Sequence, residues 1–221
     1  MMTMTTYKPD FKRAYVMANS ILVTASELVE FPLKVKFLIN KNQDINCCSF
    51  KKAQQKYQLS VDNFGSKSAI LMEMDKKMII FYNESEPKPR IRFSILHEYG
   101  HFVLGHDLET KSKEQYIIFE VETNFFAAQL QMPEQLIRYL QARGIRVNVE
   151  LLMEVFGVSR EAAEKRLKTL SQNFQLTKEE KLFDDIILDK YQNWLVSKLS
   201  ISSELFLDDY EKQMERDTWI Y

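Results

Sequence analysis

Cysteine, net charge and long apolar runs are all scarce in this 221-residue sequence, and each shortage excludes a class of protein. The only cysteines, Cys47 and Cys48, are adjacent and are interpreted as reduced residues, because neighbouring cysteines rarely pair and two thiols make no disulfide framework. A formal net charge of −1 gives no indication of nucleic acid or an anionic membrane as partner. The apolar runs are too short for a bilayer, and the first residues lack the apolar core of a secretion signal. The sequence therefore predicts a cytoplasmic protein with no membrane partner.

Histidine is equally scarce, yet all three histidines lie within ten positions, in the segment SILHEYGHFVLGH. His97, Glu98 and His101 form an H-E-x-x-H pattern, for which random placement gives roughly 0.004 copies in a chain of this composition. Residues four apart lie on one face of a helix, so both imidazoles can bind one metal ion. Glu98 can reach a water on that ion and act as general base. The pattern predicts metal ligands at His97 and His101 and a catalytic residue at Glu98.

The fold expected around this segment is α+β. AILMEM and KMIIFYN read as two strands of a hairpin joined at Asp75 and Lys76, and a polar loop leads from them to the histidine helix. A sheet followed by a metal-binding helix is typical of a small zinc peptidase. We expect a zincin-like catalytic domain over residues 1–140, with a short antiparallel sheet and active-site helices. A helical C-terminal region over residues 141–221 would follow.

The C-terminal region contains a helix-turn-helix-like hairpin at residues 147–170. Its residues 149–170, VELLMEVFGVSREAAEKRLKTL, have an apolar helix, a tight turn and a second helix capped by Ser159. Four basic residues on the second helix are partly offset by Glu161 and Glu164, which is weak for a surface that reads DNA. We therefore interpret the hairpin as packed on the catalytic body, and direct DNA binding is not expected. Further along, Thr177 and Glu180 predict a capping box at the start of another helix.

A catalytic zinc site needs a third protein ligand. His106 is nine residues after His97, which on a continuous helix is the opposite face, so we interpret it as a helix-end residue or an outer partner of the ligands. The segment IIFEVETNFFAAQLQMPEQL offers two carboxylates. Helical spacing places Glu122 on an apolar stripe, where an ionised carboxylate needs a cationic partner, and places Glu120 on a face with polar residues. We therefore predict Glu122 as the third ligand, with Glu120 as the alternative.

The two segments together resemble a known family. RIRFSILHEYGHFVLGH followed by EVETNFFAAQLQMP is similar to the ImmA/IrrE metallopeptidases. That family pairs an R-x-R-F-x-x-x-H-E-x-G-H-x-x-L-G-H helix with an E-x-N-x-F-A-A-x-L-x-M-P helix. The resemblance spans roughly residues 21–170 and is loose outside these segments. Tyr99, Thr123 and Gln131 replace commoner family residues, but none of these changes removes a ligand or Glu98.

The resemblance implies a gluzincin-like zinc endopeptidase that cleaves one regulatory protein. The typical target is a helix-turn-helix repressor of a phage, mobile element or stress locus. Zn²⁺ is the expected cofactor, and Mn²⁺ or Fe²⁺ also suit mixed nitrogen and oxygen ligands. Candidates for stabilising the oxyanion are Tyr82, Tyr99, Arg90 and Arg92.

An alternative from another class is a non-proteolytic regulator or toxin–antitoxin component that uses the zinc fold as a protein- or DNA-binding scaffold. The intact Glu98 argues against it, because a purely structural site has no use for a base.

Overall fold

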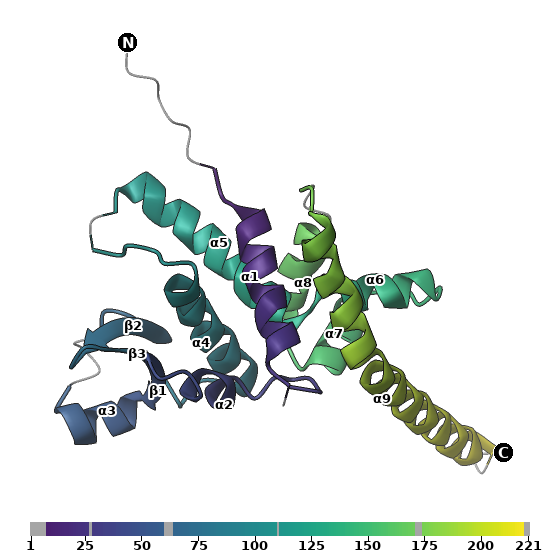
Figure 1. Ribbon diagram of the computed structural model, residues 1–221. Helices are drawn as coiled ribbons and strands as arrows, with labels where there is room; N and C mark the ends of the chain where they lie inside the picture. The colour runs from purple at the N-terminus through teal and green to yellow at the C-terminus, as the bar shows by residue number, and fades with distance from the viewer. Residues whose placement is uncertain (1–7, 27, 60–63, 110, 171–173, 219–221) are drawn as a thin grey trace.

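The computed structural model describes residues 8–218 apart from positions 27, 60–63, 110 and 171–173, with side chains described as far as residue 200. It is a mostly helical α+β molecule with a small sheet at one side (Figure 1). The elements in chain order are α1 (Phe11–Thr24), α2 (Val35–Asn40), β1 (Ile45–Ser49), α3 (Phe50–Tyr57), β2 (Ala69–Met74), β3 (Lys77–Tyr82), α4 (Lys88–Val103), α5 (Lys113–Gln131), α6 (Glu134–Ala142), α7 (Val149–Phe156), α8 (Arg160–Thr169) and α9 (Lys178–Thr218). The predicted class, a small zincin-like domain with a helical part, is confirmed. None of the described helices is both long and apolar enough to cross a membrane.

The sheet is built around the expected hairpin. β2 and β3 pair antiparallel, with Leu71 opposite Ile80. Asp75 and Lys76 join them with φ angles of 52° and 63°, the left-handed pair that matches the twist of a two-residue hairpin. The structure adds β1, which pairs parallel with β3, so the strand order is β1-β3-β2 and the sheet is mixed rather than purely antiparallel. In this order β2 is an edge strand.

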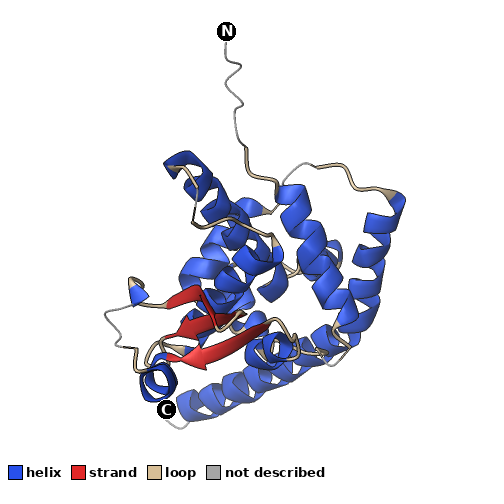
Figure 2. Cartoon of the chain, turned by 60° about the vertical axis from the view of Figure 1, so that its left-hand side comes forward, coloured by secondary structure: helices blue, strands red, loops and turns tan. Residues whose placement is uncertain are grey.

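Helices cover both faces of this sheet (Figure 2). Alternate residues of β3 point to opposite sides, as the pleat of a strand requires. Ile79 and Phe81 pack with Phe50 of α3, whereas Ile80 and Tyr82 join the main core on the side of α4. α4 therefore lies between the sheet and α5, and α1 packs against α5 in turn (Figure 1).

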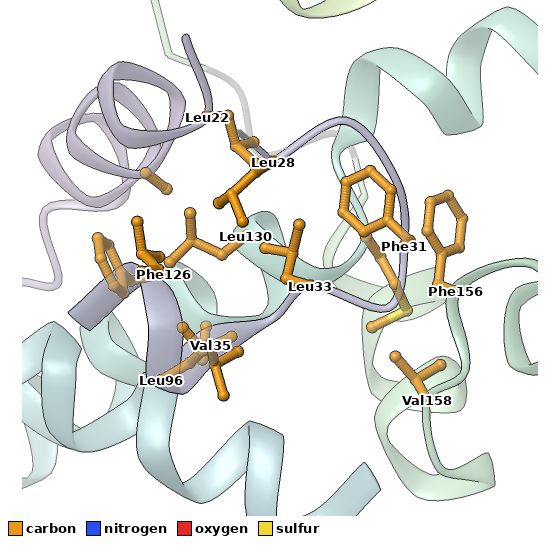
Figure 3. Close-up of a cluster of buried hydrophobic side chains, with 14 of the residues drawn as sticks. Leu22, Leu28, Phe31, Leu33, Val35, Leu96, Phe126, Leu130, Phe156 and Val158 are labelled. Carbon is orange, nitrogen blue, oxygen red and sulfur yellow. The ribbon is translucent and has the colours of Figure 1, made fainter. Parts of the chain in front are cut away.

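The main core is continuous from the helices around the sheet to the C-terminal helices. Figure 3 shows part of it, with Leu22 of α1, Leu96 of α4 and Phe126 of α5 on one side and Phe31 beside Phe156 of α7 on the other. Buried side chains of α9, including Tyr191, belong to the same cluster. Residues on either side of the expected domain boundary at position 140 therefore share one core.

In the segment where a hairpin was expected, α7 and α8 contact each other, and α8 packs against α5. α7 ends at Gly157 in the left-handed conformation (φ 63°), and the Ser159 side chain caps α8 by accepting from the Ala162 N–H.

The capping box expected at the start of α9 is also confirmed. The Glu180 N–H donates to Thr177 Oγ1 (3.2 Å), and the Thr177 N–H donates to Glu180 Oε2 (2.6 Å).

A buried arginine fastens the hairpin to the rest of the chain. Arg166 of α8 is fully buried; its Nε donates to the Met132 carbonyl (3.0 Å), and its guanidinium also donates to Gln129. Its Nη2 lies 4.0 Å from the carboxylate of Glu134. Neighbouring Lys165 pairs with Glu161 instead, and both of these side chains are exposed.

The contrast between these neighbouring cations gives a stability prediction. We expect Arg166→Ala to lower the free energy of unfolding by about 3–5 kcal/mol, because it leaves a cavity and buried acceptors without their donor. Lys165→Ala removes only an exposed pair and should change it by less than about 1 kcal/mol. Urea unfolding of both variants measures the difference. Equal losses would contradict the role given to Arg166.

Candidate metal centre

α4 holds the H-E-x-x-H residues in regular helix. The helix begins after Pro87, and Pro89 lies in its first turn, where a missing N–H breaks no helical hydrogen bond. His97 and His101 share one face, with ring centroids 5.0 Å apart. The geometry expected from their spacing is therefore present.

Gly100 allows α5 to approach this part of α4 closely. A Cβ at this position would lie 3.0 Å from Phe126 and 3.2 Å from Thr123, both on α5. A larger residue would require the Phe126 and Thr123 side chains to shift away from α4. The glycine between the two histidines of the motif therefore determines how near α5 can bring its own side chains to the imidazoles.

The side chain that α5 brings to the histidines is Glu120. Its two carboxylate oxygens lie 3.5 Å from His97 Nε2 and 3.4 Å from His101 Nε2. Within the described chain these residues form a His-His-Glu group whose ligand atoms all lie within 4.8 Å of one another. Tetrahedral zinc with bonds of about 2.0–2.1 Å separates its ligand atoms by about 3.3 Å. Spacing and donor chemistry therefore both fit one zinc ion.

Glu122, the predicted third ligand, lies elsewhere. Its carboxylate accepts the Asp10 N–H (2.6 Å) and contacts His106 Nε2 (2.9 Å). The prediction treated the Glu120 face of α5 as solvated, but α4 covers that face, and the partners of Glu122 come from the start of α1 and the end of α4. This placement corrects the sequence prediction, since Glu120, the alternative, takes the position beside the imidazoles.

His106 also departs from the geometry of a continuous helix. α4 ends in a Schellman-type reversal, in which Gly105 has φ 61° and the His106 N–H donates to the His101 carbonyl (3.0 Å). The reversal brings His106 Nδ1 to 3.0 Å from His101 Nδ1. His106 therefore contacts the outer side of His101, in line with the interpretation as an outer partner.

The surroundings of Glu120, His101 and His97 shift the pKa of each side chain. Hydrogen bonds from His101 and then His97 hold the pKa of Glu120 far below its ordinary value. Burial lowers the pKa of His101, which favours the neutral, ligating form. Burial is the largest influence on His97 and acts to lower its pKa, but Glu120, Glu98 and Asn124 together outweigh it. The net pKa is raised, so metal binding should release a proton there.

Glu98 faces the same cavity from the next position of the helix. Its Oε2 accepts the Leu71 N–H from edge strand β2 (2.9 Å), and burial raises the pKa of its carboxyl to about 7. The cavity has a volume of about 720 Å³. Its walls include the His-His-Glu group, residues 68–71, and the start of α8 at Ser159. A base with a pKa near neutrality therefore lies beside an open cleft.

The donor expected to stabilise an oxyanion is the least well predicted part. Tyr82 and Tyr99 are buried and Arg92 donates to the Gly157 carbonyl, so Arg90 is the one member of the predicted set that lines the cavity.

A residue missed by the sequence reasoning, Tyr116, also lines the cavity. It lies one helical turn before Glu120, and its pKa is raised by burial and by its contact with that carboxylate. The i, i+4 spacing from Glu120 would have indicated it once Glu120 was taken as the ligand.

Comparison with known proteins agrees with this geometry. The model of Peptidase_M78, the IrrE N-terminal-like domain, matches residues 42–168. The chain belongs to the Peptidase_M78 family. The match contains both motif helices, so the His-His-Glu group lies within the matched range.

The solved structures include a similar fold, a Mycobacterium tuberculosis transcriptional regulator with a TM-score of 0.50 and 17% sequence identity. The similarity covers 75% of this Peptidase_M78 chain and 51% of the regulator, so the chain spans about half of that protein's length. Among curated proteins, no sequence matches.

Three acidic residues of α5 provide a direct test of the ligand set. We expect Glu120→Gln to abolish tight zinc binding, because it removes one of three converging ligands. Glu122→Gln should still bind one ion, and Glu114→Gln, an exposed control on the same helix, should bind like the parent. Titration against a competing chelator measures this order. Loss of binding in Glu122→Gln with retention in Glu120→Gln would restore the original prediction.

The raised pKa of Glu98 predicts a pH dependence in the metal-free protein. The pKa is about 7 in the folded chain against an ordinary value of 4.5, so the folded state keeps this proton to higher pH than the unfolded state does. The free energy of unfolding therefore falls as the pH rises from about 4.5 to about 7. Metal-free Glu98→Gln, which avoids ionisation, should be more stable than the parent by about 1–3 kcal/mol at pH 8 and equally stable at pH 4. Urea unfolding with chelator present gives both values. A more stable parent at pH 8 would contradict the buried placement of the carboxyl.

Proposed function

We propose that this chain is a zinc-dependent endopeptidase that cleaves a regulatory protein. The observation that carries the proposal is the convergence of His97, His101 and Glu120 with Glu98 on one open cavity. A purely structural metal site would be closed and would have no base beside it. The open cavity gives a peptide access to all four side chains.

The residues of the cavity suit peptide hydrolysis. A zinc ion held by His97, His101 and Glu120 would supply Lewis acidity, which polarises a peptide carbonyl and makes a water molecule more acidic. Glu98 takes the proton of the attacking water as general base and then gives it to the leaving amine as general acid. A pKa of about 7 suits both steps near neutral pH. Tyr116 supplies a hydroxyl on the same side as Glu120 that can donate to the developing oxyanion.

Edge strand β2 provides a place for the substrate backbone. The Leu71 N–H points away from β3 and toward Glu98, so the edge of β2 that no described strand pairs with faces the cavity. Extended peptides add to such edges through main-chain hydrogen bonds. A substrate segment that pairs with β2 would pass directly in front of Glu98 and the two histidines.

The class of substrate rests on family likeness. The ImmA/IrrE resemblance implies a helix-turn-helix repressor as target, and the similar Mycobacterium tuberculosis structure is described as a transcriptional regulator, which supports a role in gene regulation. The chain's own α7–α8 hairpin does not change this assignment, because Arg166 of its second helix is buried against α5 and α6. We therefore propose cleavage of a repressor rather than direct binding to DNA.

Co-expression with any helix-turn-helix repressor encoded beside the gene tests the proposal. The parent chain should produce two fragments whose masses sum to the repressor plus one water. Glu98→Gln should retain one metal equivalent and produce none, because it lacks the base. Glu114→Gln, at an exposed position outside the cavity lining, should cleave like the parent.

Two outcomes would contradict this account. Equal cleavage by Glu98→Gln would remove Glu98 from the mechanism. Release of the repressor from DNA by both proteins, with no fragments, would instead favour the non-proteolytic scaffold.

A further inference from the structure

We propose that His106 and Glu122 form a positioning relay that holds His101 in its metal-binding orientation. This inference rests on the proposed function, since it takes His101 as a zinc ligand. The relay consists of two contacts in series. Glu122 Oε2 lies 2.9 Å from His106 Nε2, and His106 Nδ1 lies 3.0 Å from His101 Nδ1.

One assignment of protons satisfies the whole chain of contacts. If His101 binds a metal through Nε2, its proton must be on Nδ1, which donates to His106 Nδ1. His106 then carries its own proton on Nε2 and donates to the Glu122 carboxylate. Each donor therefore has an acceptor, and the negative charge of Glu122 acts through two rings on the ligating nitrogen. A carboxylate behind a ligating imidazole fixes its tautomer and raises its basicity.

The relay is shielded from water. The side chains of His101, His106 and Glu122 are 3%, 2% and 10% exposed. Phe119 stacks on the His106 ring with centroids 4.0 Å apart and an interplanar angle of 9°. Little solvent can replace the relay contacts, and the His106 ring has its plane defined by packing.

The far end of the relay is anchored by α1. The Asp10 N–H donates to Glu122 Oε1 at 2.6 Å, and Arg13 Nη2 donates to the Leu104 carbonyl at 2.6 Å. The start of α1 is thereby joined both to α5 and to the end of α4. Correct docking of α1 is then part of what orients His101.

His106 acts through His101 and is not itself a ligand. Its Nδ1 faces the Nδ1 of His101, on the side of that ring away from Glu120. The other ligand, His97, is supported differently, since its Nδ1 meets the neutral amide oxygen of Asn124 at 3.2 Å. The carboxylate relay belongs to His101, which is the more buried of the two imidazoles.

Zinc affinity measured by chelator competition tests the relay without any substrate. His106→Phe keeps a flat ring against Phe119 but removes both nitrogens, and should weaken zinc binding by about 10–100-fold. His106→Asn retains an oxygen acceptor near the Nδ1 position and should recover part of that loss. Glu122→Gln keeps an acceptor but loses the charge, and should also bind more weakly than the parent. Glu114→Gln serves as the matched control, with parental affinity.

The visible spectrum of the Co²⁺-loaded proteins separates a relay from a lost ligand. The relay variants should keep the parental spectrum, because His97, His101 and Glu120 are unchanged. Circular dichroism confirms folding, and His106→Asn and Glu122→Gln keep the test decisive if His106→Phe fails to fold. One zinc in the parent with unaltered affinity in these two variants would overturn the relay alone. Absence of zinc binding in the parent would overturn the relay together with the proposed function.

Discussion

The close packing of α4 against α5 is the constraint on which the rest of the site depends. H-E-x-x-H supplies two imidazoles from one helix, but a third ligand has to come from another element. Gly100, with no Cβ, lets Thr123 and Phe126 of α5 lie against the α4 backbone. Glu120 is one turn earlier on α5 and is therefore brought to both histidines. The distance between the α4 and α5 backbones therefore determines how far Glu120 lies from the two imidazoles.

Two different faces of α5 contribute side chains to the site. Glu120 and Asn124, four residues apart, face α4: Glu120 contacts both His97 and His101, and Asn124 contacts His97. Glu122 leaves α5 in another direction, toward the end of α4 and the start of α1, and reaches His101 only through His106. One helix therefore provides the proposed third ligand and the proposed outer support for both imidazoles. This arrangement requires α4 on one side of α5 and α1 on another, which is the packing that the fold shows.

Local sequence patterns predicted the part of the site that lies on α4, but they did not decide which acidic residue of α5 lies beside it. The H-E-x-x-H spacing, the β2–β3 hairpin and the Thr177 capping box all depend on residues close in sequence, and each is present. The choice between Glu120 and Glu122 depended on which helices cover α5, a long-range property that helical spacing alone does not contain. The apolar stripe correctly indicated that Glu122 is buried. Its carboxylate is partnered by the His106 ring and the Asp10 N–H, however, and not by a metal site formed with His97 and His101.

Other differences between sequence and structure have similar causes. β1 is a short strand whose partner β3 is some thirty residues away, and its INCCS sequence has no alternation to reveal it. The spacing of a continuous helix places His106 on the face opposite His97, whereas in the structure Gly105 reverses the chain before His106. Glycine after the last helical turn is a known signal for such a reversal and could have been used. Tyr116 became recognisable only after Glu120 had been located.

The central claim is that His97, His101 and Glu120 hold one divalent ion, and anomalous diffraction at the zinc edge from zinc-loaded crystals tests it most directly. The account predicts a single strong peak in the cavity, about 2.0–2.2 Å from His97 Nε2, His101 Nε2 and a carboxylate oxygen of Glu120. A peak bonded to Glu122 or His106, or no peak at the two histidines, would contradict it.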